Sequence, residues 1–164
     1  MRHIISLLLE NEAGSLSRVS GLFSARAFNI ESLSVAPTED PTMSRLTLVT
    51  NGSDAIVEQI TKQLNKLVDV IKVIDLNDYD HIERELMLAK VVAKKDSDHD
   101  VIKRVVDTFQ GRMIDVNENL YTIEITDTSK KIDAFLTALD DAFILEVVRT
   151  GASAILLGDR TIQS

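Results

Sequence analysis

Apolar and polar positions in the first half of the chain predict the order strand, helix, strand, strand, helix, strand. The first strand covers residues 4–9, where nearly every side chain is apolar. Apolar side chains then recur at helical spacing in Leu16, Val19 and Phe23, which predicts an amphipathic helix. The next strand is expected over residues 28–35.

The remaining elements of the first half follow from the same periodicities. The apolar phase of the second strand slips between Ile30 and Leu33, which favours a bulge. A turn with two prolines leads to a strand over residues 45–50, and the last strand covers residues 68–74. Ser53 is a good N-cap for the helix between them. One face of that helix is apolar: Ile56, Ile60, Leu64 and Leu67.

The second half repeats this order after a polar stretch that interrupts the periodicity. We therefore expect a first domain over residues 1–76, a linker over residues 77–81 and a second domain over residues 82–164. Four strands are expected in the second domain, over residues 86–92, 113–116, 121–125 and 143–148. One helix contains Val101, Val105 and Phe109, and another begins at Thr128 or Ser129. Each half is βαββαβ, so the predicted fold class is α+β, with two ferredoxin-like domains in tandem.

The first strand has apolar side chains on both of its faces. Ile5, Leu7 and Leu9 point to one side, whereas Ile4 and Leu8 point to the other. Helices cover only one face of such a sheet. Another subunit or the second domain must then cover the rest, and we expect an oligomer.

Composition narrows the class of protein further. The chain has no cysteine, which excludes disulfides and cysteine-ligated metals and fits a reducing, cytoplasmic location. A net charge of -8 and only 4% aromatic residues argue against nucleic-acid binding. No apolar run approaches a membrane span and no signal-peptide pattern is present, so we expect no membrane partner and a mature chain that begins at Met1.

The sequence offers no recognisable catalytic constellation. None of the three histidines, His3, His81 and His99, pairs with another at metal-ligand spacing, and each is expected at the surface. No G-x-S-x-G elbow occurs, and residues 151–158 lack the spacing of a dinucleotide loop. We expect no catalytic residue, no metal site and no cofactor site in this chain, which favours a sensor or a regulatory subunit.

The strongest candidate site surrounds the start of the first helix. Asn11 is a good N-cap, and Gly14 in the first turn leaves the free backbone amides uncovered. Such a helix end attracts an anion, for example a carboxylate. Asn29, which opens the next strand, adds a neutral donor and acceptor. The pattern suits a small zwitterion, although a capped helix without any ligand has the same pattern.

Motifs along the whole chain resemble one family. The first half contains Asn11-Glu-x-Gly14-x-Leu16-x-Arg18-Val19 and Phe28-Asn-Ile-Glu-Ser-Leu33. The second half contains Glu83-Arg-Glu85-Leu, Phe109-x-Gly111, Ile114-Asp115-Val116 and Lys131-x-Asp133-x-Phe135. In this order they resemble the small, regulatory subunit of acetohydroxyacid synthase (acetolactate synthase), whose N-terminal half is an ACT domain.

The resemblance implies a non-catalytic partner of a large subunit that uses thiamine diphosphate, Mg²⁺ and FAD. It implies that the small subunit activates this enzyme and confers feedback inhibition by a branched-chain amino acid, typically valine, in branched-chain amino acid synthesis. The two apolar faces of the first strand, together with a Gly14 that faces outward, predict a homodimer formed through the ACT domains, with the effector at their shared interface. The expected effector site comprises Asn11, Ala13, Gly14, Ser15, Leu16, Asn29 and Ile30.

The chain departs from the family pattern at two places. Ala27 stands where the family has glycine, which costs on the order of 1 kcal/mol if the backbone there has a positive φ. Ala154-Ile155-Leu156-Leu157 replaces a stretch that contains a basic residue, so a family contact made by this tail is in question.

Two other functions stay open at this point. A free-standing amino-acid sensor would share the first domain but would not need the motifs of the second half. A small enzyme is compatible with a ferredoxin-like scaffold, which hosts many functions. The missing catalytic constellation argues against that enzyme.

Overall fold

The computed structural model describes residues 1–140 and 143–163, which form two compact units. Unit 1 comprises Met1–Ile82 together with Ala152–Ser164, and unit 2 comprises Glu83–Gly151. Each unit has two helices packed on an antiparallel β-sheet whose four main strands follow the βαββαβ order, so the predicted tandem of ferredoxin-like domains is confirmed; a further short strand pairs with the second sheet. None of the described helices is long and apolar enough to cross a membrane.

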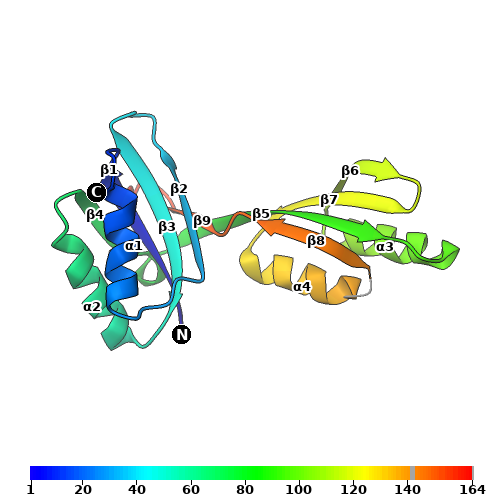
Figure 1. The fold of residues 1–164 in the computed structure, drawn as a ribbon, viewed down its shortest axis with the longest axis horizontal. Helices are drawn as coiled ribbons and strands as arrows, with labels where there is room; N and C mark the ends of the chain where they lie inside the picture. Colours follow the sequence, from blue (N-terminus) through cyan, green and yellow to red (C-terminus); the bar gives the residue numbers. More distant parts are fainter. Residues whose placement is uncertain (141–142, 164) are drawn as a thin grey trace. The chain divides into compact units, whose positions relative to one another are not determined.

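Unit 1 follows the predicted order of elements (Figure 1). Its elements are β1 (Arg2–Glu10), α1 (Ser15–Ala25), β2 (Ser32–Pro37), β3 (Met43–Asn51), α2 (Asp54–Asn65) and β4 (Val70–Asp75). The strand order is β2-β3-β1-β4, with every neighbouring pair antiparallel. Ser53 caps α2 as predicted, because its side chain accepts a hydrogen bond from the backbone N–H of Ile56. The two helices and one face of the sheet enclose the core.

The predicted apolar faces of the helices are confirmed except in the first turn of each helix. Leu16 and Ile56 are exposed, whereas Val19 and Phe23 of α1 and Val57 of α2 are buried. Each exposed residue lies in the first turn of its helix. The first buried side chain is Ser15 in α1, one position before Leu16, and Val57 in α2, one position after Ile56.

The predicted bulge in the second strand is wrong. β2 pairs with β3 in unbroken register from Ser32 to Pro37. Residues 28–30 precede the strand, and the side chains of Phe28 and Ile30 pack against the core from a loop. The change of apolar phase therefore marks the boundary between loop and strand.

The end of α1 explains the expected glycine at position 27. Ala27 has φ 56, and the backbone N–H of Phe28 donates to the carbonyl of Phe23 at 2.9 Å. This is a Schellman ending, in which the left-handed residue is usually glycine. α3 ends in the same way, with Gln110 at φ 57.

Ala27→Gly is expected to raise the free energy of unfolding of unit 1 by about 0.5–1 kcal/mol. A left-handed backbone costs a residue that has a Cβ roughly 1–2 kcal/mol, and glycine removes this strain. Glycine also loses more conformational entropy on folding, which cancels about half of the gain. Local amide exchange of α1 would measure the change. As a control, Ala25→Gly inside the last turn should lower stability by about 1 kcal/mol. An equal loss in both variants would contradict the strain at Ala27.

Unit 2 repeats the architecture of unit 1. Its elements are β5 (His81–Val92), α3 (Asp96–Thr108), β6 (Arg112–Asn117), β7 (Leu120–Asp127), α4 (Ser129–Leu139) and β8 (Ile144–Arg149). The strand order is β6-β7-β5-β8. Glu118 has φ 53 in the predicted hairpin turn, and Thr128 caps α4.

A buried ion pair joins β5, β8 and α4 in unit 2. Arg149 donates to both carboxylate oxygens of Glu85, at 2.6 and 3.1 Å, and to Asp133 at 2.7 Å. Ser129 donates to the same Glu85 carboxylate at 2.6 Å. Burial by itself raises the pKa of Glu85, but the hydrogen bonds from Arg149 and Ser129 and the Arg149 charge outweigh it, so this pKa lies below its ordinary value.

The expected second domain, residues 82–164, includes the C-terminal segment. In the structure this segment instead belongs to unit 1. β9 (Ser153–Leu156) pairs with β5, and Ala152, Ala154 and Leu156 are buried against Ile4 of unit 1. The reason is the apolar second face of β1, which this segment covers. Residues 141, 142 and 164 of the expected range lie outside the described part.

The expected linker is also largely part of unit 1. Residues 76–78 form a 3-10 helix, and Leu76 is fully buried. Asn77 accepts a hydrogen bond from the backbone N–H of Ile4 at 2.9 Å and donates to the carbonyl of Arg2 at 2.8 Å. These bonds tie the polar stretch to the start of β1.

The prediction that His3 lies at the surface is wrong. Only 4% of His3 is exposed, and its ring lies between Asp75, 3.0 Å from Nδ1, and Asp54, 3.3 Å from Nε2. The position of His3 opposite Thr50 of β3 in the sheet buries it, which local sequence does not reveal. His81 and His99 are only partly exposed, and their Nδ1 atoms contact the Tyr79 carbonyl and the Tyr121 hydroxyl.

Candidate functional site

The start of α1 is open, but its geometry differs from the predicted one. Gly14, not Asn11, is the N-cap residue, with φ 87, and no side chain caps the first turn. The Asn11 side chain instead donates to the carbonyl of Pro41 at 3.0 Å. Because Asn11 is held by the loop before β3, the amides of the first turn stay free of a side-chain partner.

A cavity of about 220 Å³ lies beside this helix end. Its wall combines the apolar side chains of Leu9, Leu16 and Val35 with the polar side chains of Asn11 and Ser15. Only 4% of Ser15 is exposed, and its hydroxyl has no hydrogen-bond partner among the described residues. A buried hydroxyl without a partner is unusual and costs free energy, so a ligand in this cavity would satisfy it.

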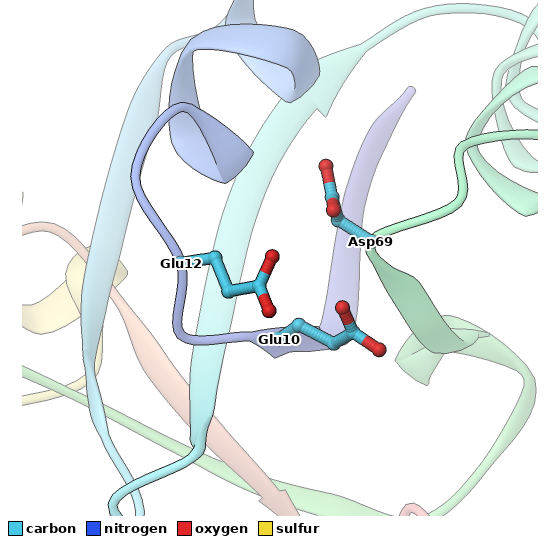
Figure 2. A group of neighbouring side chains, drawn as sticks. All are labelled: Glu10, Glu12 and Asp69. Carbon is cyan, nitrogen blue, oxygen red and sulfur yellow. The ribbon is translucent and has the colours of Figure 1, made fainter.

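Carboxylates gather at the same end of the helix. Figure 2 shows Glu10, Glu12 and Asp69, whose carboxylates come together from the end of β1, the loop before α1 and the turn just before β4. One oxygen of each lies within 4.8 Å of the others. Glu10 and Glu12 also line the cavity. These two can attract the ammonium group of an amino acid.

A guanidinium group balances part of this negative charge. Arg18, one turn into α1, donates through Nε to the carboxylate of Asp69. That hydrogen bond is the main reason that the pKa of Arg18 lies above its ordinary value. Oxygen ligands of this kind suit Mg²⁺ or Ca²⁺, but Arg18 already occupies the Asp69 carboxylate, which leaves the cluster an incomplete metal site.

Arg18 also lies close to Gly14. A Cβ built on Gly14 would stand 3.1 Å from Nη1 of Arg18. The missing side chain at position 14 therefore keeps room between the helix amides and a cation. The free amides of the helix and the Arg18 guanidinium both favour a carboxylate in that space.

The structure brings together only part of the predicted site. Asn11, Ser15 and Leu16 line the cavity, and Ala13 and Gly14 are exposed in the loop next to it. Asn29 and Ile30 follow the other end of α1, which has 11 residues and a length of about 16 Å. Asn29 is exposed and its carbonyl accepts a hydrogen bond from Thr50, while Ile30 packs against the core.

Several functional candidates were not found from the sequence. The acidic residues Glu10 and Glu12 flank Asn11 in the chain, so their nearness to the helix start was a signal that could have been used. Asp69 precedes β4 and Val35 lies in β2, and only the pairing of distant strands brings them to the site.

Comparisons with known proteins agree on one family. Residues 5–72 match the AHAS small subunit-like ACT domain, and residues 84–158 match the small subunit of acetolactate synthase. The acetolactate synthase small subunit of Haemophilus influenzae is 54% identical over 163 residues, covering 99% of both chains. The isozyme 3 small subunit of Escherichia coli is 51% identical over 99% of this chain and 100% of its own length.

A solved structure agrees as well. The acetolactate synthase small subunit of Thermotoga maritima superposes with a TM-score of 0.86 at 37% identity, covering 98% of this chain and 99% of that one. The similarity therefore extends through both units and the C-terminal segment. The resemblance drawn from the sequence motifs is confirmed, and this chain belongs to the family of acetolactate synthase small subunits.

Proposed function

We propose that this chain is a regulatory subunit that binds the catalytic large subunit of acetolactate synthase, activates it and makes it sensitive to valine. It performs no catalysis of its own. The family supports the large subunit as partner. The observation that carries the sensory role is the buried, unpartnered Ser15 hydroxyl in a cavity beside an open helix end.

The groups around this cavity match the parts of a branched-chain amino acid. The carboxylate is held by the first-turn amides of α1, by Ser15 and by Arg18. The ammonium group is paired by Glu10 and Glu12. The branched side chain lies against the apolar side chains of Leu9, Leu16 and Val35. One methyl group is worth only about 1–3 kcal/mol in such a pocket, so leucine and isoleucine are expected to compete with valine.

The test is the activity of the cognate large subunit with and without this chain. The proposal expects higher activity when the chain is added and loss of that activity as valine is titrated. Calorimetry with valine, leucine and isoleucine measures binding directly. Unchanged activity on mixing, with valine still bound by the chain, would favour the free-standing sensor and contradict the proposal.

We assign activation and effector binding to unit 1, and the full valine response to both units together. A chain that ends at residue 76 would uncover Ile4 and Val49, because Ala152, Ala154 and Leu156 cover them. Unit 1 should therefore be tested within the full chain, by substitutions and not by truncation.

The chain is expected to form a homodimer through unit 1, with one effector site completed by both copies. Asn29 and Ile30 lie at the opposite end of α1 from the cavity, so they can contribute to an effector only across an interface. β2 is an edge strand and carries the exposed side chain of Val35, so this edge of the sheet is available for an interface with a second copy. The surplus apolar face of β1, by contrast, no longer argues for it, because the C-terminal segment covers that face.

Light scattering should give a mass twice the 18.2 kDa of one chain. The dimer should persist or tighten when valine is added, because a ligand shared by two copies stabilises their association. As a matched control, Leu145, exposed on the edge strand of unit 2, can be replaced by Lys without effect on this mass. A stable monomer that binds valine would contradict the shared site.

A further inference from the structure

A second cavity of unit 1 lies on the opposite face of its sheet from the helices. Its volume is about 240 Å³, and the C-terminal segment forms one of its walls. Leu8, Met43, Ile155 and Ile162 make much of its surface apolar. It shares no residue with the cavity beside α1.

Arg45 gives this cavity its charge. The side chain projects from near the start of β3, where its backbone pairs with Leu8 of β1. Its guanidinium donates to two neutral oxygens, the Ser6 hydroxyl and the Ala154 carbonyl, the latter at 3.2 Å. Among the described residues no carboxylate pairs with it. A guanidinium has five N–H donors, so donors remain for a further partner.

The surroundings of Arg45 make that missing partner significant. Burial lowers the pKa of Arg45, because the sheet and the C-terminal segment remove water without supplying an anion. A partly buried cation is normally paired, since desolvation otherwise costs free energy. An anion from solution would supply the pair.

The other charged groups of the cavity limit what this anion can be. Arg160 lines the same cavity and lies with its guanidinium 4.5 Å from the centre of the Tyr79 ring. Glu39 lines it too. Among the described residues that line the cavity, two cations and one carboxylate give a net charge of +1, which suits a monoanion. The apolar wall suits a short alkyl chain, and a volume below the usual ~300 Å³ of drug-sized pockets suits a small molecule.

We infer that this cavity binds a small aliphatic monocarboxylate, with its carboxylate on Arg45 and its alkyl chain between β1, β3 and the C-terminal segment. The inference stands independently of the proposed effector site, because the two cavities lie on opposite faces of the sheet. A ligand here would contact both the sheet and the segment that covers it. It would therefore stabilise the C-terminal segment in its docked position.

Isobutyrate is the probe for a first experiment on the full chain with methyl-labelled Ile, Leu and Met. Saturable shifts are expected for the methyl groups of Leu8, Met43, Ile155 and Ile162, together with contacts between the methyl protons of isobutyrate and those of Ile155. Isobutyramide has the same shape without the charge, and it should leave these signals in place. Equal shifts by isobutyramide, by chloride or by phosphate, or no shift with isobutyrate, would overturn the inference.

Variants then identify the cation. Arg45→Gln should weaken isobutyrate binding by about tenfold or more, because a charge-assisted pair is lost. Arg26→Gln, an exposed arginine after α1, is the matched control and should bind as the unchanged chain does. Gly14→Asp, which alters only the other cavity, should also bind normally. If Arg45→Gln binds isobutyrate as well as the control does, the assignment to Arg45 is wrong, and unchanged core methyl signals of Ile5 and Leu48 show that each variant is folded.

Discussion

Gly14→Asp is expected to abolish inhibition by valine while leaving activation of the large subunit largely intact. Gly14 is the N-cap of α1, and its missing side chain leaves the amides and Arg18 open to a carboxylate. Aspartate would place a negative charge in that space and could pair with Arg18 itself. Charge-assisted hydrogen bonds contribute roughly 1.5–3 kcal/mol each, so losing one or two weakens valine binding by about tenfold to several-hundredfold or more.

The matched control is Gly14→Asn, which has the same size and no charge. Both variants place a Cβ at φ 87, where strain costs on the order of 1 kcal/mol, and asparagine tolerates this region better than most residues. The two should therefore differ mainly in charge. A valine titration with excess large subunit should show a much larger shift of the inhibition midpoint for Gly14→Asp. An unchanged midpoint in that variant would show that valine does not bind at this helix end.

The order of elements could be predicted from the sequence because periodicity is a local property. Both halves follow the predicted βαββαβ order, and Ser53 and Thr128 cap their helices as expected. The positive φ of Ala27 could be anticipated too, since the family pattern has glycine there. Each of these features depends on residues within a few positions of one another.

The features that could not be predicted depend on residues far apart in the chain. The C-terminal segment covers Ile4 and Val49, more than 100 positions away, and no periodicity marks that pairing. His3 is buried between Asp54 and Asp75 for the same kind of reason. Asn11 has the residue type of an N-cap, but the loop before β3 offers its side chain a different partner.

The candidate site was predicted in the same uneven way. The open end of α1 could be predicted because Gly14 and the residues around it are consecutive in the sequence. The charges that make the site suitable for a zwitterion come partly from Arg18, paired with Asp69 of the segment before β4. A metal or catalytic centre requires particular residue types, such as clustered histidines, cysteines or a nucleophile with its base, which can be recognised in a sequence. A binding site for a small amphoteric molecule uses ordinary residues, and geometry alone distinguishes it.

Arg149→Met is expected to destabilise unit 2 by about 3 kcal/mol, the low end of the ~3–5 kcal/mol found when one partner of a buried ion pair is removed. Glu85 is 4% exposed and would keep its charge without a cation. The low end applies because the Arg149 side chain is itself 31% exposed. Amide exchange of the β5 and β7 core would measure the loss. Arg112→Met, which removes an exposed pair with Glu124 in the same sheet, should cost only about 0–1 kcal/mol.

The dependence on pH separates this ion pair from a loss of packing. The pKa of Glu85 is lowered in the folded chain, so its pair contributes stability above the ordinary carboxyl pKa, near 4.3, and that contribution disappears as the pH falls through the lowered value. In Arg149→Met burial raises the pKa of Glu85, so this variant loses less on acidification. The difference between the two chains should therefore be largest at neutral pH and shrink below about pH 4.

Replacing both partners, Glu85→Leu with Arg149→Met, should restore most of the lost stability, since no buried charge remains. A constant difference between pH 7 and pH 4, with no recovery in the double variant, would mean that Arg149 stabilises unit 2 through its packing and not through Glu85.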